Sequence, residues 1–171
     1  MSKTRQYATV GIMLALILAF QAMNMPQLIT GCIVNAVLVF ALLYIGLNAA
    51  IMLSILSPIG AFLSGILPSI MLPLLGIVAI GNILLVVSLK STNKNNYYVR
   101  LLVPSMVKSL FIGLMCYIIA AFNFFYIPDL FLMPFALSQL VTSIVGIILA
   151  YKAINVCNLE YLNGDTRISA V

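Results

Sequence analysis

The chain has 171 residues, of which 64% are hydrophobic and only 6% are charged, and its formal net charge is +5. A soluble domain carries about a quarter charged residues, so this composition excludes a water-soluble globular protein. It predicts one polytopic membrane domain covering residues 1–171, since the length leaves no room for a separate soluble module. The cations flank apolar segments and form no basic patch, which argues against nucleic-acid binding and fits cytoplasmic loops rich in Lys and Arg.

The apolar residues fall into six runs, each of a length that can cross the hydrocarbon core of a bilayer as an α-helix. We therefore expect an all-α fold with six transmembrane helices. In chain order, the predicted helices cover approximately residues 7–23, 31–47, 49–67, 70–89, 101–125 and 131–151. Asn48 is predicted to mark a tight turn between the second and third helices, and the long polar loop is Lys90–Arg100.

The distribution of cations predicts the orientation in the membrane. With six spans, one side of the membrane receives seven cations: Lys3, Arg5, Lys90, Lys94, Arg100, Lys152 and Arg167. The other side receives one formal charge, Asp129. Because cytoplasmic loops carry an excess of Lys and Arg, both termini are predicted to be cytoplasmic, in a multi-pass protein of the plasma membrane.

The first predicted helix carries three small residues at four-residue spacing, Gly11, Ala15 and Ala19. Small residues on one face let a second helix approach closely, which is how helices associate in lipid. Two interpretations are open for this strip. It packs against the protein's own bundle, or it docks to a separate membrane subunit.

Two further helices show stripes of small or polar residues at spacings of three and four. The stripe in the third helix comprises Ala50, Ser54, Ser57, Pro58, Ala61, Ser64, Gly65 and Pro68. The stripe in the sixth helix comprises Gln139, Thr142, Ser143, Gly146 and Ala150. The third-helix stripe is predicted to lie in the middle of the bundle, in contact with neighbours on several sides.

Lys108 is the one charge placed well inside an apolar run. A cation in the middle of a helix costs about 2.5–3.5 kcal/mol even on the lenient insertion scale. Two accounts remain open at this point. The side chain extends back to the cytoplasmic interface, or it faces the interior, hydrogen-bonds Asn82 and supports a binding site.

The residue types present exclude several kinds of chemistry. The chain has no His and no Trp, and no acidic residue lies inside a predicted span. Metal sites, carboxylate ion relays and nucleophile–base pairs therefore cannot be assembled within the spans, so we expect no enzyme activity, no catalytic residue, no metal and no cofactor. The polar residues that remain predict an outer-half site for a neutral or anionic small molecule. Its candidate residues are Gln27, Asn35, Asn123 and Gln139, with Lys108 deeper in the membrane.

The order of short motifs along the chain resembles a known family. The motifs are Ser2–Arg5, Ala15 with Ala19, Pro26–Gly31, Asn35–Ala36, Ser57–Pro58, Gly65–Pro68, Gly81–Asn82, Lys108, Gln139–Thr142 and Gly146. Together they are similar to the substrate-binding S component of an energy-coupling factor (ECF) vitamin transporter. The resemblance covers nearly the whole chain, although tryptophan-based thiamine stacking and the histidine-rich N-terminus of metal-specific members are absent.

The resemblance implies a six-helix membrane protein that captures a vitamin-like micronutrient near the outer face. It also implies docking through the first helix to a transmembrane coupling subunit, which two ATPase subunits drive. Two other functions stay open from the residues themselves. One is a small structural membrane protein that scaffolds other proteins, and the other is a facilitator that works without an ATPase partner.

Overall fold

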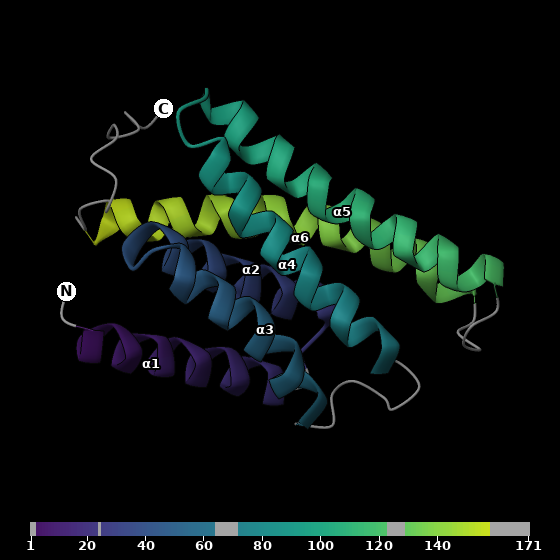
Figure 1. Ribbon diagram of the computed structural model, residues 1–171, viewed down its shortest axis with the longest axis horizontal. Coiled ribbons are helices and arrows are strands. Elements are labelled where there is room, and N and C mark those ends of the chain that lie inside the picture. The colour runs from purple at the N-terminus through teal and green to yellow at the C-terminus, as the bar shows by residue number, and fades with distance from the viewer. Residues whose placement is uncertain (1–2, 24, 64–71, 123–128, 158–171) are drawn as a thin grey trace.

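The computed structural model describes residues 3–23, 25–63, 72–122 and 129–157, and these residues form six α-helices (Figure 1). The helices are α1 (Lys3–Ala22), α2 (Gln27–Tyr44), α3 (Leu47–Leu63), α4 (Leu72–Ser91), α5 (Tyr97–Phe122) and α6 (Asp129–Val156). The predicted all-α fold is confirmed for this part of the chain.

Five of the described helices are long and apolar enough to cross a membrane, namely α1, α2, α4, α5 and α6. The described part of α3 has 17 residues and is a shorter apolar helix. Length and composition of the helices therefore indicate a multi-pass membrane protein.

Four helices extend four or more residues beyond their predicted ends. α1 begins at Lys3, α2 begins at Gln27, α5 begins at Tyr97 and α6 continues to Val156. Charged and polar residues suggest loops at these places, but Lys, Arg and Gln are good helix formers and none of the added segments contains Gly or Pro. As a consequence, Arg100 lies inside α5, where it is buried and its Nε donates a 3.1 Å hydrogen bond to the Tyr151 hydroxyl of α6.

The turn between α2 and α3 lies at Ile45–Gly46, so its prediction at Asn48 was wrong. Gly46 has φ 127°, a left-handed conformation that glycine adopts without steric cost. Its N–H donates to the carbonyl of Ala41 at the end of α2, and its own carbonyl accepts from the N–H of Ala50 in α3. Gly46 therefore ends one helix and starts the next, which places Asn48 in the first turn of α3.

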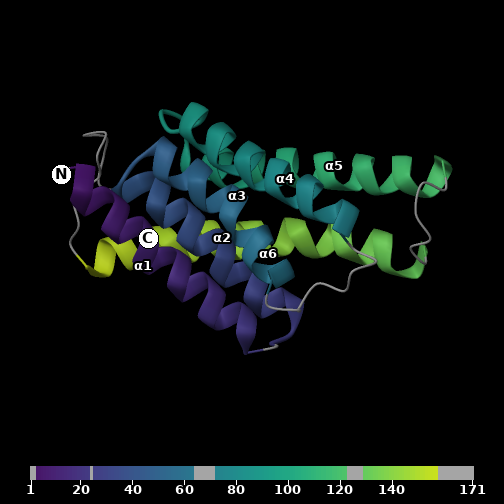
Figure 2. The same cartoon turned by 60° about the horizontal axis from the view of Figure 1, so that its bottom comes forward.

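The helices pack in a bundle with α1 and α5 at opposite edges (Figures 1 and 2). α6 packs against both α2 and α5, and α4 packs against both α3 and α5. The main hydrophobic core includes the fully buried side chains Ile17, Leu38, Leu53, Leu85 and Ile147. It draws on five of the six helices, so it joins the bundle into one unit.

The third-helix stripe is buried as predicted. Its described members, Ala50, Ser54, Ser57, Pro58 and Ala61, are all buried. α3 contacts α1, α2 and α4, which confirms its central place in the bundle. Ser64, Gly65 and Pro68 lie outside the described residues.

The start of α1, the α4–α5 connection and the end of α6 lie at the same end of the bundle (Figure 1). The exposed cations Lys3, Lys90, Lys94 and Lys152 belong to these segments. We refer to this end as the basic end. An excess of Lys and Arg favours the cytoplasmic side for it.

We expect a thiol label at Asn95→Cys, in the exposed α4–α5 connection, to react only from the cytoplasmic side, because the basic end resists translocation. A reporter fused after Val171 should also be cytoplasmic, and a label at Asp129→Cys should react from outside. The measurement is labelling of whole cells and inverted vesicles with a membrane-impermeant maleimide, in a background without Cys32, Cys116 and Cys157. Labelling of Asn95→Cys on intact cells would overturn the six-span topology.

Candidate functional site

Lys108 is buried in the interior of the bundle, with 2% of its surface exposed. Its Nζ donates hydrogen bonds to Oδ1 of Asn35 in α2, at 2.7 Å, and to Oδ1 of Asn82 in α4, at 2.8 Å. The predicted hydrogen bond to Asn82 is confirmed. The alternative, in which the side chain extends back to the interface, was wrong, because the side chain is buried and its Nζ is bonded to these two amides within the bundle.

The glycine before Asn82 lies where α4 and α5 pack closely. A Cβ atom at Gly81 would lie 2.8 Å from Cδ1 of Ile112 and at an ordinary contact distance of 3.6 Å from Cγ of Lys108. A side chain at this position would therefore have to displace the end of Ile112, one turn along α5 from Lys108.

A second set of hydrogen bonds continues from Asn35 into α6. Nδ2 of Asn35 donates to Oγ1 of Thr142 at 3.2 Å, and Oγ1 of Thr142 donates to the backbone carbonyl of Gln139 at 3.2 Å. Oγ of Ser143 donates to the same carbonyl at 2.6 Å. Lys108, Asn35, Asn82 and Thr142 thus form one polar network, contributed by α5, α2, α4 and α6, which we call the Lys108 network.

Two glycines allow α2 and α6 to approach closely enough for this network. A Cβ atom at Gly146 would lie 2.5 Å from Cβ of Asn35 and 3.0 Å from the backbone nitrogen of Ala36. A Cβ atom at Gly31 would lie 3.0 Å from Cγ2 of Thr142. The small-residue stripe in α6 is therefore a close-packing surface for α2, and its five members are buried.

Gly146→Ala is expected to destabilise the protein by about 1–3 kcal/mol, because the added methyl group must push α2 away from α6. Gly11→Ala is the matched control, since a Cβ atom there meets nothing within 4 Å. The measurement is the free energy of unfolding of the purified protein in detergent, by denaturant titration. Equal stability of the two variants would contradict the close approach of α2 and α6.

The charge of Lys108 is accommodated without a carboxylate in the described part of the chain. The chain has three acidic residues, Asp129, Glu160 and Asp165, and their side chains lie outside the described residues. The two amide oxygens accept two of the three N–H donors of the ammonium. They contribute dipoles and no net charge, so a negatively charged group beside Nζ would be favourable in this low-dielectric setting.

The structure brings together only some of the predicted substrate-binding residues. Asn35 and Lys108 are in the network, and Gln139 is buried and supplies a backbone acceptor. Gln27 is exposed at the start of α2, about 12 Å along the helix from Asn35 at 1.5 Å per residue. Asn123 lies outside the described residues. The predicted outer-half site comprises Gln27, Asn35, Asn123 and Gln139. Gln27 does not lie near Asn35, so this residue does not belong to such a site.

The Lys108 network lies near the middle of the helices, whereas the amide side chains were predicted to lie in the outer half of the membrane. Asn35 is the ninth of the 18 residues of α2, and Lys108 is the twelfth of the 26 residues of α5. Both stand near the middle of their helices and not in the outer half. The predicted substrate-binding set does not include Asn82 and Thr142. The spacing of Thr142 from Gln139 and the predicted hydrogen bond from Lys108 to Asn82 are the two signals in the sequence that point to them.

The small-residue strip of α1 lies on the outside of the bundle. Gly11, Ala15 and Ala19 are exposed, whereas the buried residues of α1 are Val10, Met13, Ile17 and Gln21. The interpretation in which this strip packs against the protein's own bundle was therefore wrong. The strip is accessible to a partner or to lipid.

Comparison of the chain with protein-family models, with curated proteins and with solved structures finds no match.

Proposed function

We propose that this protein is the substrate-capture subunit of an ATP-driven importer of the ECF type. It would bind a small vitamin-like molecule from outside and span the plasma membrane six times, with both termini in the cytoplasm. A transmembrane coupling subunit and two ATPase subunits would be its partners.

The observation that carries this proposal is the Lys108 network. A cation buried in the membrane is costly and marks a functional site by default. Here it is held by two neutral amides, from α2 and α4, and the described part of the chain gives it no carboxylate. A carboxylate or another acidic group of a ligand would accept the remaining N–H of Nζ and balance its charge. This favours an anionic ligand over a neutral one.

The exposed strip of α1 supports the second half of the proposal. Gly11, Ala15 and Ala19 are exposed on the edge helix of the bundle (Figure 1). In lipid the hydrophobic effect contributes little to helix association, so close van der Waals contact across small residues is a main driving force. Since the sequence has no phosphate-binding glycine loop, ATP hydrolysis must come from partners, and this strip is the surface on which one would dock.

A scaffolding protein remains the alternative, because the same network could serve only to hold α2, α4, α5 and α6 together. The two functions differ in their partners. We expect that a tagged chain, purified in mild detergent from membranes of its source cells, retains one further membrane protein and ATPase subunits. Retention of other proteins without any ATPase would favour the scaffold, and uptake by vesicles that contain this chain alone would favour a facilitator.

A further inference from the structure

A pocket of about 520 Å³ opens at the basic end of the bundle, between the start of α1, the α2–α3 turn and the end of α4. It lies away from the Lys108 network, since none of the four network residues lines it. The described residues that line it include Lys3, Tyr7, Asn48, Met52 and Lys90.

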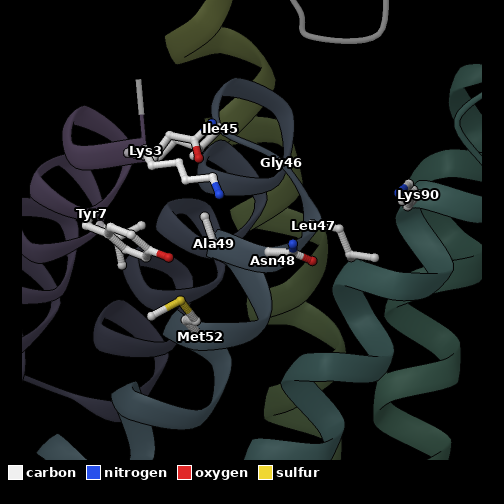
Figure 3. A pocket seen from close by; sticks show the side chains of 11 residues that line it. Lys3, Tyr7, Ile45, Gly46, Leu47, Asn48, Ala49, Met52 and Lys90 are labelled. Carbon is white, nitrogen blue, oxygen red and sulfur yellow. The ribbon is translucent and has the colours of Figure 1, made fainter. Parts of the chain in front are cut away.

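The polar residues that line this pocket carry positive charge and hydrogen-bond donors. Figure 3 shows the Lys3 side chain and the Tyr7 hydroxyl directed toward the start of α3, with Asn48 beyond Ala49 and Lys90 on the far side of the pocket, on α4. None of the described lining residues is acidic. An ammonium group near a hydroxyl, with a second cation on the opposite side, is suited to a phosphate group or another oxyanion.

The lining also includes apolar residues, and an exposed apolar stripe on α3 adjoins the pocket. Met52 lines the pocket and is 40% exposed. It begins a stripe of exposed apolar residues at spacings of three, four and four: Met52, Ile55, Ile59 and Leu63. The stripe extends over twelve residues, about 16 Å from first to last at 1.5 Å per residue, which is roughly half of the 30 Å hydrocarbon core of a bilayer.

We propose that this pocket binds the headgroup of an anionic phospholipid, with an acyl chain lying along the α3 stripe. The positive charges of Lys3 and Lys90 are complementary to the negative charge of a lipid phosphate. The length of the α3 stripe is close to the hydrocarbon thickness of one leaflet. A free phosphate ion would use only the lysines and would leave the continuity with the stripe unexplained. Anionic lipids are attracted to basic segments at a membrane surface, and the pocket lies where such lipids would be concentrated if the basic end is cytoplasmic. The inference does not depend on the transport function proposed above.

The test compares three probes on the purified full chain in a zwitterionic detergent: phosphatidylglycerol, phosphatidylcholine and inorganic phosphate. We expect phosphatidylglycerol alone to raise the unfolding temperature and to remain bound in native mass spectrometry. The double variant Lys3→Gln/Lys90→Gln should bind phosphatidylglycerol about tenfold or more weakly, because it lacks both cations of the pocket. The matched control is Lys94→Gln/Lys152→Gln, which removes two exposed cations that do not line the pocket.

A second measurement locates the acyl chain in the wild-type protein and decides the question even if a lysine variant fails to fold. A phosphatidylglycerol with a photoactivatable acyl chain should crosslink preferentially to the α3 peptide that contains Met52 and Ile55. The exposed α5 residues Leu102 and Met106 serve as the comparison surface, because they lie about as far from the basic end as Met52 and Ile55 do. Equal crosslinking of the two helices, equal binding of phosphatidylcholine, or equal loss in both lysine pairs would each overturn the proposal. Competition by inorganic phosphate at micromolar concentration would show a free-phosphate site and no lipid site.

Discussion

Lys108→Met is expected to weaken ligand binding about 10- to 100-fold, because it removes a charge-assisted hydrogen bond to an anionic ligand. The substitution also removes the desolvation cost of a buried charge. The amide oxygens of Asn35 and Asn82 lose their donor, which costs about 1–3 kcal/mol for each oxygen. We therefore expect the variant to fold but to be less stable than wild type.

The measurement is the change in unfolding temperature of the purified protein with a library of small neutral and anionic metabolites. Wild type should be stabilised by at least one compound class, Lys108→Met by none, and the exposed-cation control Lys152→Met by the same compounds as wild type. Asn82→Asp tests the sign of the ligand charge, because it places a carboxylate where the amide oxygen lies 2.8 Å from Nζ. This variant should be at least as stable as wild type and should reject an anionic ligand. If Lys108→Met keeps full affinity, the network only joins helices.

Ala15→Trp is expected to abolish uptake and leave ligand binding intact. Ala15 is exposed on α1, so a bulky side chain there overpacks nothing within the bundle. It would hold a docking helix away from the flat strip formed by Gly11, Ala15 and Ala19, where close contact depends on small side chains. The expected loss of uptake is therefore not accompanied by a loss of stability.

The measurement pairs ligand affinity of the purified variant with uptake in cells that contain the ATPase module. Leu16→Trp is the matched control, because Leu16 is also exposed but lies about 100° around the helix from Ala15. Loss of affinity and uptake together in Ala15→Trp would show that the strip stabilises the isolated protein. Normal uptake in that variant would remove α1 from the coupling step.

The sequence predicts the helices well because their signal is local. Runs of apolar residues specify each helix, and the described residues of the small-residue stripes in α3 and α6 are buried as their spacing predicts. Helix ends are predicted less well. Residues such as Lys3 and Tyr97 are polar enough to suggest loop, yet they continue a helix because no Gly or Pro interrupts it. The α2–α3 turn is predicted two residues too late because Asn48 is the polar residue in this segment. The residue that forms the turn is Gly46, which adopts the left-handed conformation.

The candidate site could be predicted only in part, because it depends on contacts between helices far apart in the sequence. Lys108 is conspicuous in an apolar run, and Asn82 could be proposed as its acceptor. The participation of Asn35 depends on how closely α2 approaches α6, and Gly146 and Gly31 set that distance. Spacing along one helix carries no information on this approach. For the same reason, the depth of the amides could not be derived from their positions near predicted loops.

The central claim, that the Lys108 network holds part of a small-molecule site, is tested most directly by untargeted mass spectrometry of small molecules released from the purified protein. Wild type and the Lys152→Met control should release one anionic compound in near-stoichiometric amount. Lys108→Met, purified in parallel, should release little or none of it. Equal release from Lys108→Met and wild type would contradict the account.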